Sequence, residues 1–357
     1  MLMKIFQILL NKTKNSSYRY AEELYLSLSS MEDIDIDQSI IVDKSEFNPD
    51  LIDIINSCDY VFIHSISKDK DLYNILINFI KPKKILFITH TILKQWHNDI
   101  NLSYIIPLLR NVSKIVINPL ALDIINEIKE KLSDEQFNKK YIELKYIYNF
   151  YLFNTINKDN TISMVSNKGI RTNYDLFINL FKNKEILDQK FIWKLYGITK
   201  NLQTYSVNDL YINNQTQKTS LITNFDNSII SNDKINVYGE IDKQTYKEVI
   251  EKSLFTCNFD NESYISYNII DIIGNGSIPI MSKSVAKNIR INQKQTLYDL
   301  KCGIFINDAF DEQSIITINK LVQSPNTYIN TLNKHVNIFK QIFNNTEILN
   351  KLLSEIL

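Results

Sequence analysis

Residues 258–290 read NFDNESYISYNIIDIIGNGSIPIMSKSVAKNIR, and they follow a short run, SLFTC, at residues 253–257. The run predicts a buried strand, and apolar spacing over residues 266–274 predicts a helix. Gly276, Ser277, Ile278 and Pro279 then open the next predicted strand, at residues 277–281. A strand, a helix and a second strand in this order indicate a βαβ unit of a parallel sheet.

The same alternation extends in both directions from this stretch. Further strands are predicted at residues 4–10, 39–42, 60–65, 85–90, 114–118 and 144–149, and again at 162–166, 191–196, 235–238 and 303–306. Helices are predicted at residues 18–28, 72–80, 120–132, 171–181, 243–252 and 311–323, with two more over 325–357. The strands are nearly all apolar, as expected where both faces of a sheet are covered.

The polar stretch at residues 154–160 separates two such series, and 357 residues suit two domains. We therefore expect an α/β protein with two doubly wound, Rossmann-like domains and a cleft between them. The expected parts are residues 1–152, 153–324 and a final pair of helices at 325–357. Ligands of such folds bind at the carboxyl ends of the strands, so the chemistry is sought there.

The composition restricts the function further. Lys and Arg number 40, as do Asp and Glu, which argues against coating nucleic acid by bulk charge but leaves a local basic groove open. The three cysteines have no CxxC spacing, which indicates a reducing compartment without disulfides. No apolar stretch approaches the roughly 18–20 residues of a membrane span. We expect a cytoplasmic protein, monomeric or a simple dimer, without stable membrane insertion or an essential bound metal.

Two carboxylates near the predicted helix at 266–274 could carry chemistry. The start of that helix offers free N–H groups and a positive dipole end, which suit a phosphate. Asp271, one to two turns into the helix, can accept from the hydroxyls of a ribose, and Glu262 in the preceding loop can reach sugar hydroxyls. The structural alternative is a solvated acidic loop before a capped helix.

Lys168 and Arg171 follow the first strand of the second domain, in SMVSNKGIR at residues 163–171. An arginine can grip phosphate oxygens bidentately, where a lysine acts as a point charge; the alternative is a solvated basic turn. His90 ends a predicted strand of the first domain, in KKILFITHT at residues 83–91. His64 ends another strand and ranks lower, and His97 and His335 lie in polar helical contexts that predict surface positions.

An acidic residue, a helix with a second acid and Gly-Ser-x-Pro resemble the donor-binding motif of retaining GT-B glycosyltransferases. Within this family, residues 267–284 and KNIR at 287–290 are similar to a segment of the DNA α-glucosyltransferases of T-even phages. Those enzymes move glucose from UDP-glucose to 5-hydroxymethylcytosine in DNA. Weaker likenesses follow in the same order: SCDYVFIHS at 57–65, IYNF at 147–150 and CGIFIND at 302–308.

The resemblance implies a retaining, UDP-sugar-dependent hexosyltransferase in which residues 153–324 bind the donor and residues 1–152 face the acceptor. The helices at 325–357 would pack back toward the first domain. The implied roles are Asp271 on the ribose, Lys168 and Arg171 on the diphosphate, Glu262 on the sugar, backbone N–H groups near Ser263 and Ser266 on the phosphate or sugar, and His90 orienting the sugar.

The sequence departs from the family pattern at three places. Ile270 stands where the second acid of the family motif is expected, so the sugar-contacting position is open between Glu262 and Ser266. Thr89 and Thr91 flank His90 where the phage enzymes have a His/Asp-rich run. The loop at residues 11–17, NKTKNSS, lacks the family's glycines, and Asn15 is its candidate donor contact.

The acceptor implied by the resemblance is double-stranded DNA with hydroxymethylated bases, in host cytoplasm for a phage-encoded protein, and the target base could need flipping. Candidate DNA contacts are Lys12, Lys14, Arg19 and Lys94, or the group Lys81, Lys83 and Lys84. Two alternatives stay open. One is a GT-B transferase of surface polysaccharide, glycolipid or glycoprotein synthesis, and the other is an inactive transferase-like binding module.

Overall fold

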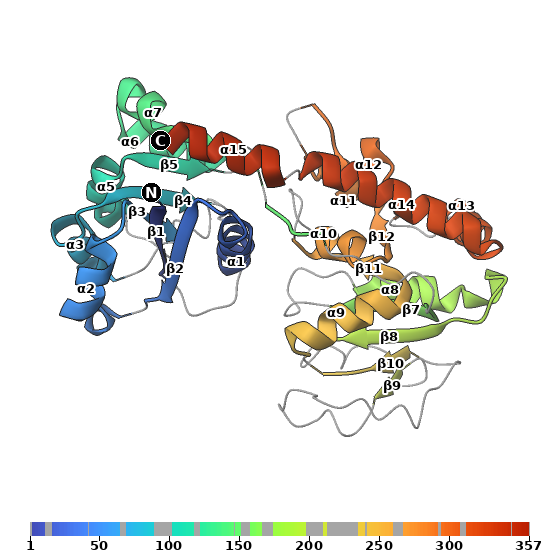
Figure 1. Cartoon of the computed structure of the whole chain (residues 1–357). Helices are drawn as coiled ribbons and strands as arrows, with labels where there is room; N and C mark the ends of the chain where they lie inside the picture. Colours follow the sequence, from blue (N-terminus) through green and yellow to red (C-terminus); the bar gives the residue numbers. More distant parts are fainter. Residues whose placement is uncertain are drawn as a thin grey trace. The chain divides into compact units, whose positions relative to one another are not determined.

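The structure is a computed structural model of the chain, and it divides into two compact units (Figure 1). Unit 1 comprises Met1–Asn149 and Phe343–Leu357, and unit 2 comprises Phe150–Ile342. The residues that the structure describes are 2–10, 16–41, 43–64, 69–88, 102–117, 122–145, 147–150, 158–165, 174–197, 210–212, 235–239, 241–259, 267–291, 294–307, 312–343 and 345–356.

Unit 1 is built on a six-stranded parallel sheet in the order β2-β1-β3-β4-β5-β6. Its strands are β1 (Met3–Leu9), β2 (Ile34–Ile40), β3 (Tyr60–His64), β4 (Lys83–Ile88), β5 (Lys114–Ile117) and β6 (Tyr141–Glu143). Its helices are α1 (Ser16–Ser29), η1 (Lys44–Glu46), α2 (Pro49–Asn56), α3 (Lys70–Asn78), α5 (Leu102–Asn111), α6 (Leu122–Lys131), α7 (Asp134–Lys140) and α15 (Asn345–Ile356).

The central strands of unit 1 are buried on both faces, because apolar side chains fill successive positions. Val61 and Ile63 on β3 and Leu86 on β4 are fully buried. The edge strand β2 differs, since Ile34 and Ile36 are buried while Asp35 and Asp37, which follow them in turn, are exposed. This alternation explains why the strand covers residues 34–40 rather than the predicted 39–42: an edge strand has one solvated face and no continuous apolar run.

Unit 2 contains a seven-stranded parallel sheet in the order β13-β12-β11-β7-β8-β10-β9. Its strands are β7 (Asp159–Val165), β8 (Ile192–Tyr196), β9 (Leu210–Ile212), β10 (Ile235–Val237), β11 (Ser253–Asn258), β12 (Ile278–Ser282) and β13 (Ile304–Ile306). Its helices are α8 (Tyr174–Lys182), η2 (Lys184–Ile186), α9 (Lys243–Lys252), α10 (Tyr267–Gly274), α11 (Lys283–Asn288), α12 (Leu297–Leu300), α13 (Glu312–Val322) and α14 (Pro325–Ile342).

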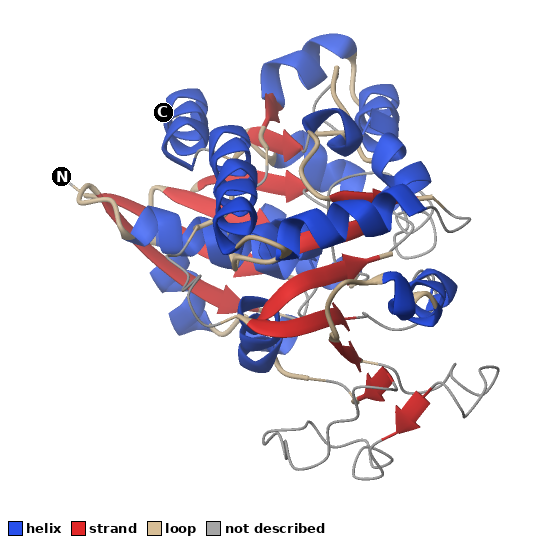
Figure 2. Ribbon diagram, turned by 90° about the vertical axis from the view of Figure 1, so that its right-hand side faces the viewer, coloured by secondary structure: helices blue, strands red, loops and turns tan. Residues whose placement is uncertain are grey.

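Helices pack against the strands in Figure 2, as the pattern of strands alternating with helices predicts. The predicted fold class, two doubly wound α/β sheets, is confirmed. Among the described residues, no helix is both long and apolar enough to cross a membrane.

Two expectations at the unit boundary differ from the structure. The strand predicted at 144–149 is instead β6 at Tyr141–Glu143, followed by a non-strand segment in which Ile147 and Tyr148 are buried. Of the helices at 325–357, only α15 groups with unit 1, where the Tyr60 hydroxyl donates to the Ile356 carbonyl at 3.2 Å. Helix α14 groups with unit 2, because its buried stripe packs on α10 and α13.

Candidate donor site

Strand β7 is the point in unit 2 where the order of the sheet reverses. The chain runs from β7 to β8 on one side, and it later continues from β11 to β12 and β13 on the other side. In doubly wound sheets, ligands bind at the carboxyl ends of the strands at such a switch point. The candidate site of unit 2 is therefore the carboxyl edge of β7 and β11.

The two segments with predicted donor residues both leave this edge. Lys168 and Arg171 follow β7, while Glu262, Ser263 and Ser266 follow β11, and these five residues lie outside the described ones. The strands they follow are direct neighbours, with Met164 of β7 paired in register with Cys257 of β11. The topology therefore starts both segments side by side at one edge of the sheet.

Asp271 is the predicted donor residue of unit 2 that the structure describes. It is the fifth residue of α10, and its side chain is buried, with 7% of the residue exposed. Only Asn275 to Ser277 separate the end of α10 from β12, so the helix ends near the amino edge of the sheet and begins near the carboxyl edge. The first N–H groups of α10 are thus directed to the candidate site, as phosphate binding requires.

The burial of Asp271 is notable because the rest of α10 is mainly apolar. Its helical neighbours Ile269, Ile270, Ile272 and Ile273 are all buried. A buried carboxylate is costly unless polar groups or charges compensate it, so packing alone gives no reason to place aspartate in this helix.

The glycine and serine of the Gly-Ser-x-Pro motif have structural roles. Gly276 has a φ of 84°, and its N–H donates to the Ile273 carbonyl at 3.1 Å while the Ser277 N–H donates to the Ile272 carbonyl at 2.9 Å. This pair of bonds ends α10 in a Schellman motif, which requires a left-handed residue and favours glycine. The motif therefore fixes how α10 returns to the sheet, and thereby where Asp271 lies.

The carboxyl edge of unit 1 has its own switch point at β1, which lies between β2 and β3. Lys12, Lys14 and Asn15 follow β1, and His90 and Lys94 follow β4; all five lie outside the described residues.

His64 is the residue that the structure does show at this edge, as the last residue of β3. It is 1% exposed and stacks on Phe87, with ring centroids 4.5 Å apart. Neither ring nitrogen has a hydrogen-bond partner within the described part of the chain. Burial lowers the pKa of His64 to about 3, so the ring is neutral at physiological pH.

His335 corrects an expectation. It was predicted at the surface, but only 4% of it is exposed, because it lies on the buried stripe of α14 beside Leu332 and Val336. Burial and then the nearby charge of Lys334 lower its pKa to about 4. The polar residues around it in the sequence concealed its place on the apolar face. His97 lies outside the described residues.

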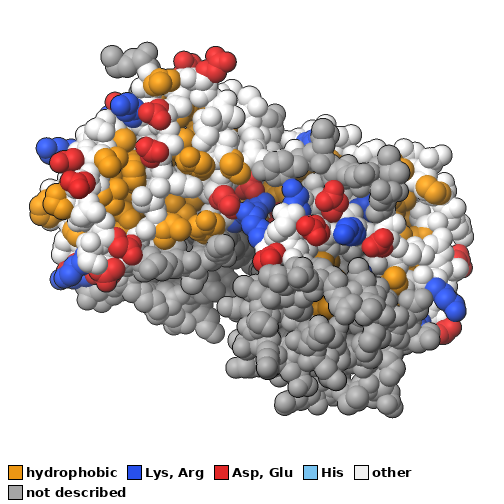
Figure 3. Space-filling model, turned by 60° about the horizontal axis from the view of Figure 1, so that its bottom comes forward, with side chains coloured by type: hydrophobic (Ala, Val, Ile, Leu, Met, Phe, Trp, Pro, Cys, Tyr) orange, Lys and Arg blue, Asp and Glu red, His pale blue; other side chains and the backbone are white. Residues whose placement is uncertain are grey.

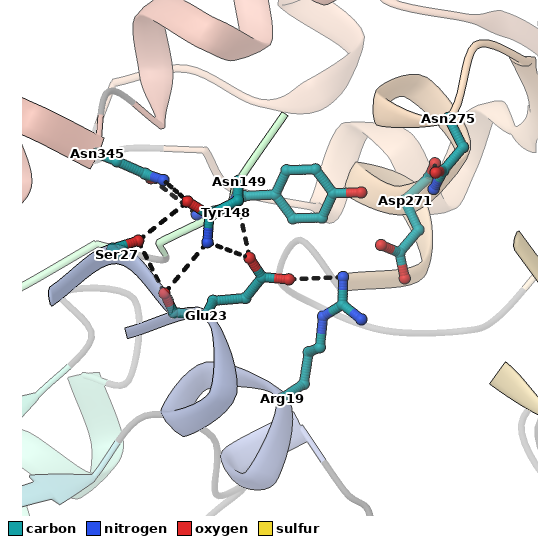
Figure 4. Close-up of polar contacts among 8 residues, drawn as sticks. All are labelled: Arg19, Glu23, Ser27, Tyr148, Asn149, Asp271, Asn275 and Asn345. Carbon is teal, nitrogen blue, oxygen red and sulfur yellow. Dashed lines mark hydrogen bonds and ion pairs between the residues drawn. The ribbon is translucent and has the colours of Figure 1, made fainter. Parts of the chain in front are cut away.

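Arg19 lies in the first turn of α1 and is held by unit 1 itself (Figure 4). Its Nη2 lies 2.6 Å from Oε1 of Glu23, and its guanidinium lies 5.8 Å from the centre of the Tyr148 ring. The Glu23 carboxylate balances the Arg19 charge, so Arg19 is not simply a solvated basic residue.

The alternative basic group lies at the other end of the sheet. Lys83 and Lys84 begin β4, so they lie at its amino edge, and Lys84 is buried with its Nζ 2.6 Å from the Ile80 carbonyl. On the face shown in Figure 3, acidic and basic side chains of the described residues are interspersed. The described residues also contain no group of three or more His, Cys, Asp or Glu able to hold a metal ion.

The chain is similar to known proteins in its structure, whereas its sequence matches none. No family model and no curated protein matches the sequence. An alpha-glucosyltransferase in complex with UDP-glucose and DNA containing an abasic site matches with a TM-score of 0.75 and 12% identity, over 99% of this chain and 98% of that chain. An alpha-glucosyltransferase with UDP and a DNA 13-mer containing a HMU base matches with a TM-score of 0.77 and 11% identity, over 99% and 98%.

A more distant match is Anabaena HepE in complex with UDP-glucose, with a TM-score of 0.58 and 9% identity, over 99% of this chain and 100% of that one. The resemblance predicted from residues 258–290 is thus confirmed for the fold. Along nearly its whole length, the chain has the GT-B-type fold of these alpha-glucosyltransferases.

Proposed function

We propose that this protein is a retaining glycosyltransferase that moves a sugar, glucose in the first instance, from a UDP-sugar to a hydroxymethylated base in DNA. The observation that carries the proposal is the buried carboxylate of Asp271 on a helix that begins at the switch point of unit 2. It occurs in a chain that matches, over 99% of its length, alpha-glucosyltransferases holding UDP-glucose and DNA.

Unit 2 would bind the nucleotide. Asp271 would accept hydrogen bonds from the ribose hydroxyls, and the first N–H groups of α10 would face the phosphate or sugar. Lys168 and Arg171 would neutralise the diphosphate, and Glu262 or Ser266 would hold the sugar hydroxyls. Two cations beside the diphosphate accelerate the reaction because negative charge grows there as the glycosidic bond breaks.

The proposed step is a balanced group transfer. The bond between the sugar C1 and the β-phosphate oxygen breaks, and its electron pair leaves with UDP. A new bond forms between C1 and the oxygen of the base's hydroxymethyl group, and the proton of that hydroxyl passes to the departing phosphate. His90 would orient the sugar from unit 1. No covalent intermediate on the protein is needed.

DNA would be held by local contacts rather than by bulk charge, since basic and acidic residues are equal in number. Lys12 and Lys14 follow β1 at the carboxyl edge of unit 1, and Lys94 follows β4 at the same edge. The charge of Arg19 is balanced by Glu23. Arg19 would therefore hold one group of the DNA in place by a local contact, rather than attract the duplex by its charge. A target base inside a duplex would have to flip out to reach the sugar.

The proposal is tested by UDP release from a panel of UDP-sugars, measured with unmodified DNA, 5-hydroxymethylcytosine DNA and 5-hydroxymethyluracil DNA. Release that rises with modified DNA alone supports the proposal and identifies the donor and base together. Slow UDP release that is the same with and without DNA would indicate a glycan or lipid acceptor instead. The match to HepE gives this alternative weaker support. No release and no UDP binding would leave an inactive binding module.

A further inference from the structure

Unit 1 is made of two separate stretches of chain, so the polypeptide passes between the units twice. It leaves unit 1 after Asn149 and returns at Phe343. Asn149 at the first crossing and Asn345 just after the second belong to one polar cluster with side chains of helix α1, six residues of unit 1 in all (Figure 4). The cluster consists of Arg19, Glu23, Ser27, Tyr148, Asn149 and Asn345.

Glu23 lies at the centre of this cluster and is 2% exposed. Its Oε1 pairs with Arg19 Nη2 at 2.6 Å. Its Oε2 accepts from the Asn149 backbone N–H at 3.0 Å and from Asn149 Nδ2 at 2.7 Å. The carboxylate therefore binds α1 to the last residue of the first stretch, with both oxygens engaged.

The returning stretch is tied to the same point. Asn345, the first residue of α15, donates from Nδ2 to Asn149 Oδ1 at 3.0 Å, and its own Oδ1 accepts from the Tyr148 N–H at 2.9 Å. Ser27 Oγ lies 2.8 Å from the Glu23 carbonyl and 3.0 Å from Asn149 Oδ1. Helix α1 and the two crossings are thus joined by side chains from all three.

The stability of α1 does not explain the Arg19–Glu23 pair. A cation in the first turn opposes the helix dipole, and a basic residue four positions before an acidic one is the weaker arrangement of an i,i+4 pair. Burying a carboxylate also costs several kcal/mol before any partner repays it. Arginine is further unusual here, because Arg occurs at only four positions of a chain with 40 Lys and Arg together.

We propose that Glu23 is a positioning residue that makes α1 and both chain crossings move as one body. Movement between the units is then taken up beyond Asn149 and before Phe343, while the first turn of α1 stays fixed to the crossings. The proposal assigns Glu23 no contact with donor or acceptor. The expected effect of Glu23 on the reaction rate rests on the proposed function. Its role in holding the two crossings to α1 does not.

Hydrogen exchange of the intact protein tests this directly, with Glu23→Ala, Glu23→Gln and Lys140→Met as variants. Loss of hydrogen bonds to a buried charge should speed exchange over 147–150 and the first turn of α15 by about 10- to 100-fold in Glu23→Ala. Glu23→Gln keeps an acceptor for Asn149 and should speed it by less than about tenfold, so it reports even if the alanine variant folds poorly.

Lys140→Met is the matched control, since Lys140 Nζ caps α5 on the carbonyls of Leu109, Arg110 and Val112 at 3.1, 2.6 and 2.7 Å. This substitution should speed hydrogen exchange at the end of α5 and leave the exchange of residues 147–150 unchanged. Unchanged exchange at both crossings in folded Glu23→Ala would overturn the proposal, as would equal loosening there by Lys140→Met.

The kinetic readout separates this proposal from the proposed function. Because the proposed ribose and diphosphate contacts are assigned to unit 2, Glu23→Ala should lower kcat by about tenfold or more with little change in the KM for the UDP-sugar. If exchange changes as expected but no donor is turned over even by the unaltered protein, the positioning role stands and the proposed activity fails. If kcat is unaffected in an active enzyme, the catalytic part of the positioning role is refuted.

Discussion

Asp271 is more informative about function than its neighbours in α10. It is a buried acid in a mostly apolar helix. The sequence alone identified it because it lies one to two turns into a helix whose start suits a phosphate, where a carboxylate can accept from ribose hydroxyls. The sequence could not reveal its burial, since a helix before a glycine turn is as consistent with a solvated face. The Gly276 turn and the neighbouring strands β7 and β11 make the placement specific.

Replacing Asp271 with asparagine should weaken UDP binding by about 10- to 100-fold, because a charge-assisted hydrogen bond to the ribose becomes a neutral one. The measurement is UDP affinity by calorimetry. Asp299→Asn is the control, since Asp299 is an exposed carboxylate that caps α12 in the same unit. Unchanged affinity in folded Asp271→Asn would show that the donor site lies elsewhere.

A second prediction concerns Gly303 and the free energy of unfolding of unit 2. Its φ is +141°, and a Cβ there would lie 2.7 Å from Met281 Cε and 2.9 Å from the Pro279 carbonyl oxygen. The methionine end can move but the backbone oxygen cannot, so Gly303→Ala should destabilise unit 2 by about 1–3 kcal/mol in urea unfolding.

A neighbouring substitution gives the opposite sign. Lys301 ends α12 in the left-handed region with a φ of 53°, so Lys301→Gly should stabilise the same unit by up to about 1 kcal/mol. If both variants lower stability equally, backbone conformation is not what distinguishes the two positions.

At the scale of elements, a row of buried hydroxyls crosses the three strands that frame the candidate site. Thr256 on β11 lies 3.2 Å from Ser163 on β7 and 2.9 Å from Ser277 beside β12, oxygen to oxygen. All three side chains are at most 1% exposed. The row helps to hold β7 and β11 in the register on which the candidate site depends.

Thr256→Val keeps the shape of the side chain but removes both hydrogen bonds, so it should cost about 1–3 kcal/mol in the free energy of unfolding. Adding Ser163→Ala removes a hydroxyl left without its partner and should recover part of that loss, which a double-mutant cycle measures. Strictly additive losses would mean that the two hydroxyls do not interact.

Most elements could be predicted because their apolar period is clear, and the failures have physical causes. Helix α9 was predicted with the bounds it has, and β3 and β5 within one residue. Strand β2 was misplaced because an edge strand alternates, and residues 144–149 were misassigned because hydrogen bonds of side chains, not a strand ladder, hold Tyr148 and Asn149. The network around Glu23 joins residues more than 120 positions apart, and no local pattern shows it.

At the scale of the whole molecule, the described residues of each unit include one buried neutral histidine, His64 in unit 1 and His335 in unit 2. Their pKa values, lowered to about 3 and about 4, lie below the value of about 6.5 in an unfolded chain. The unfolded chain therefore binds more protons below pH 6.5, so these groups' contribution is complete above that pH and is lost as the pH falls.

Each pH unit below about 6.5 should remove about 1.4 kcal/mol per histidine, until the folded pKa is reached. Urea unfolding at about pH 7.5 and pH 5.5 measures this, with the two units followed separately if their transitions differ. In His64→Phe the pH dependence of unit 1 should become shallower while that of unit 2 persists. Equal stability of the unaltered protein at both pH values would contradict the assignment of neutral buried rings.

The central claim is sugar transfer to a modified base, and the most direct measurement is mass spectrometry of nucleosides from 5-hydroxymethylcytosine DNA incubated with the protein and UDP-glucose. The account predicts a glucosylated hydroxymethyl nucleoside with the anomeric configuration of the donor, which the anomeric proton signal in NMR reports, and its formation should fall sharply with Asp271→Asn. Intact hydroxymethylcytosine after incubation with every UDP-sugar, from a protein that binds UDP, would contradict it.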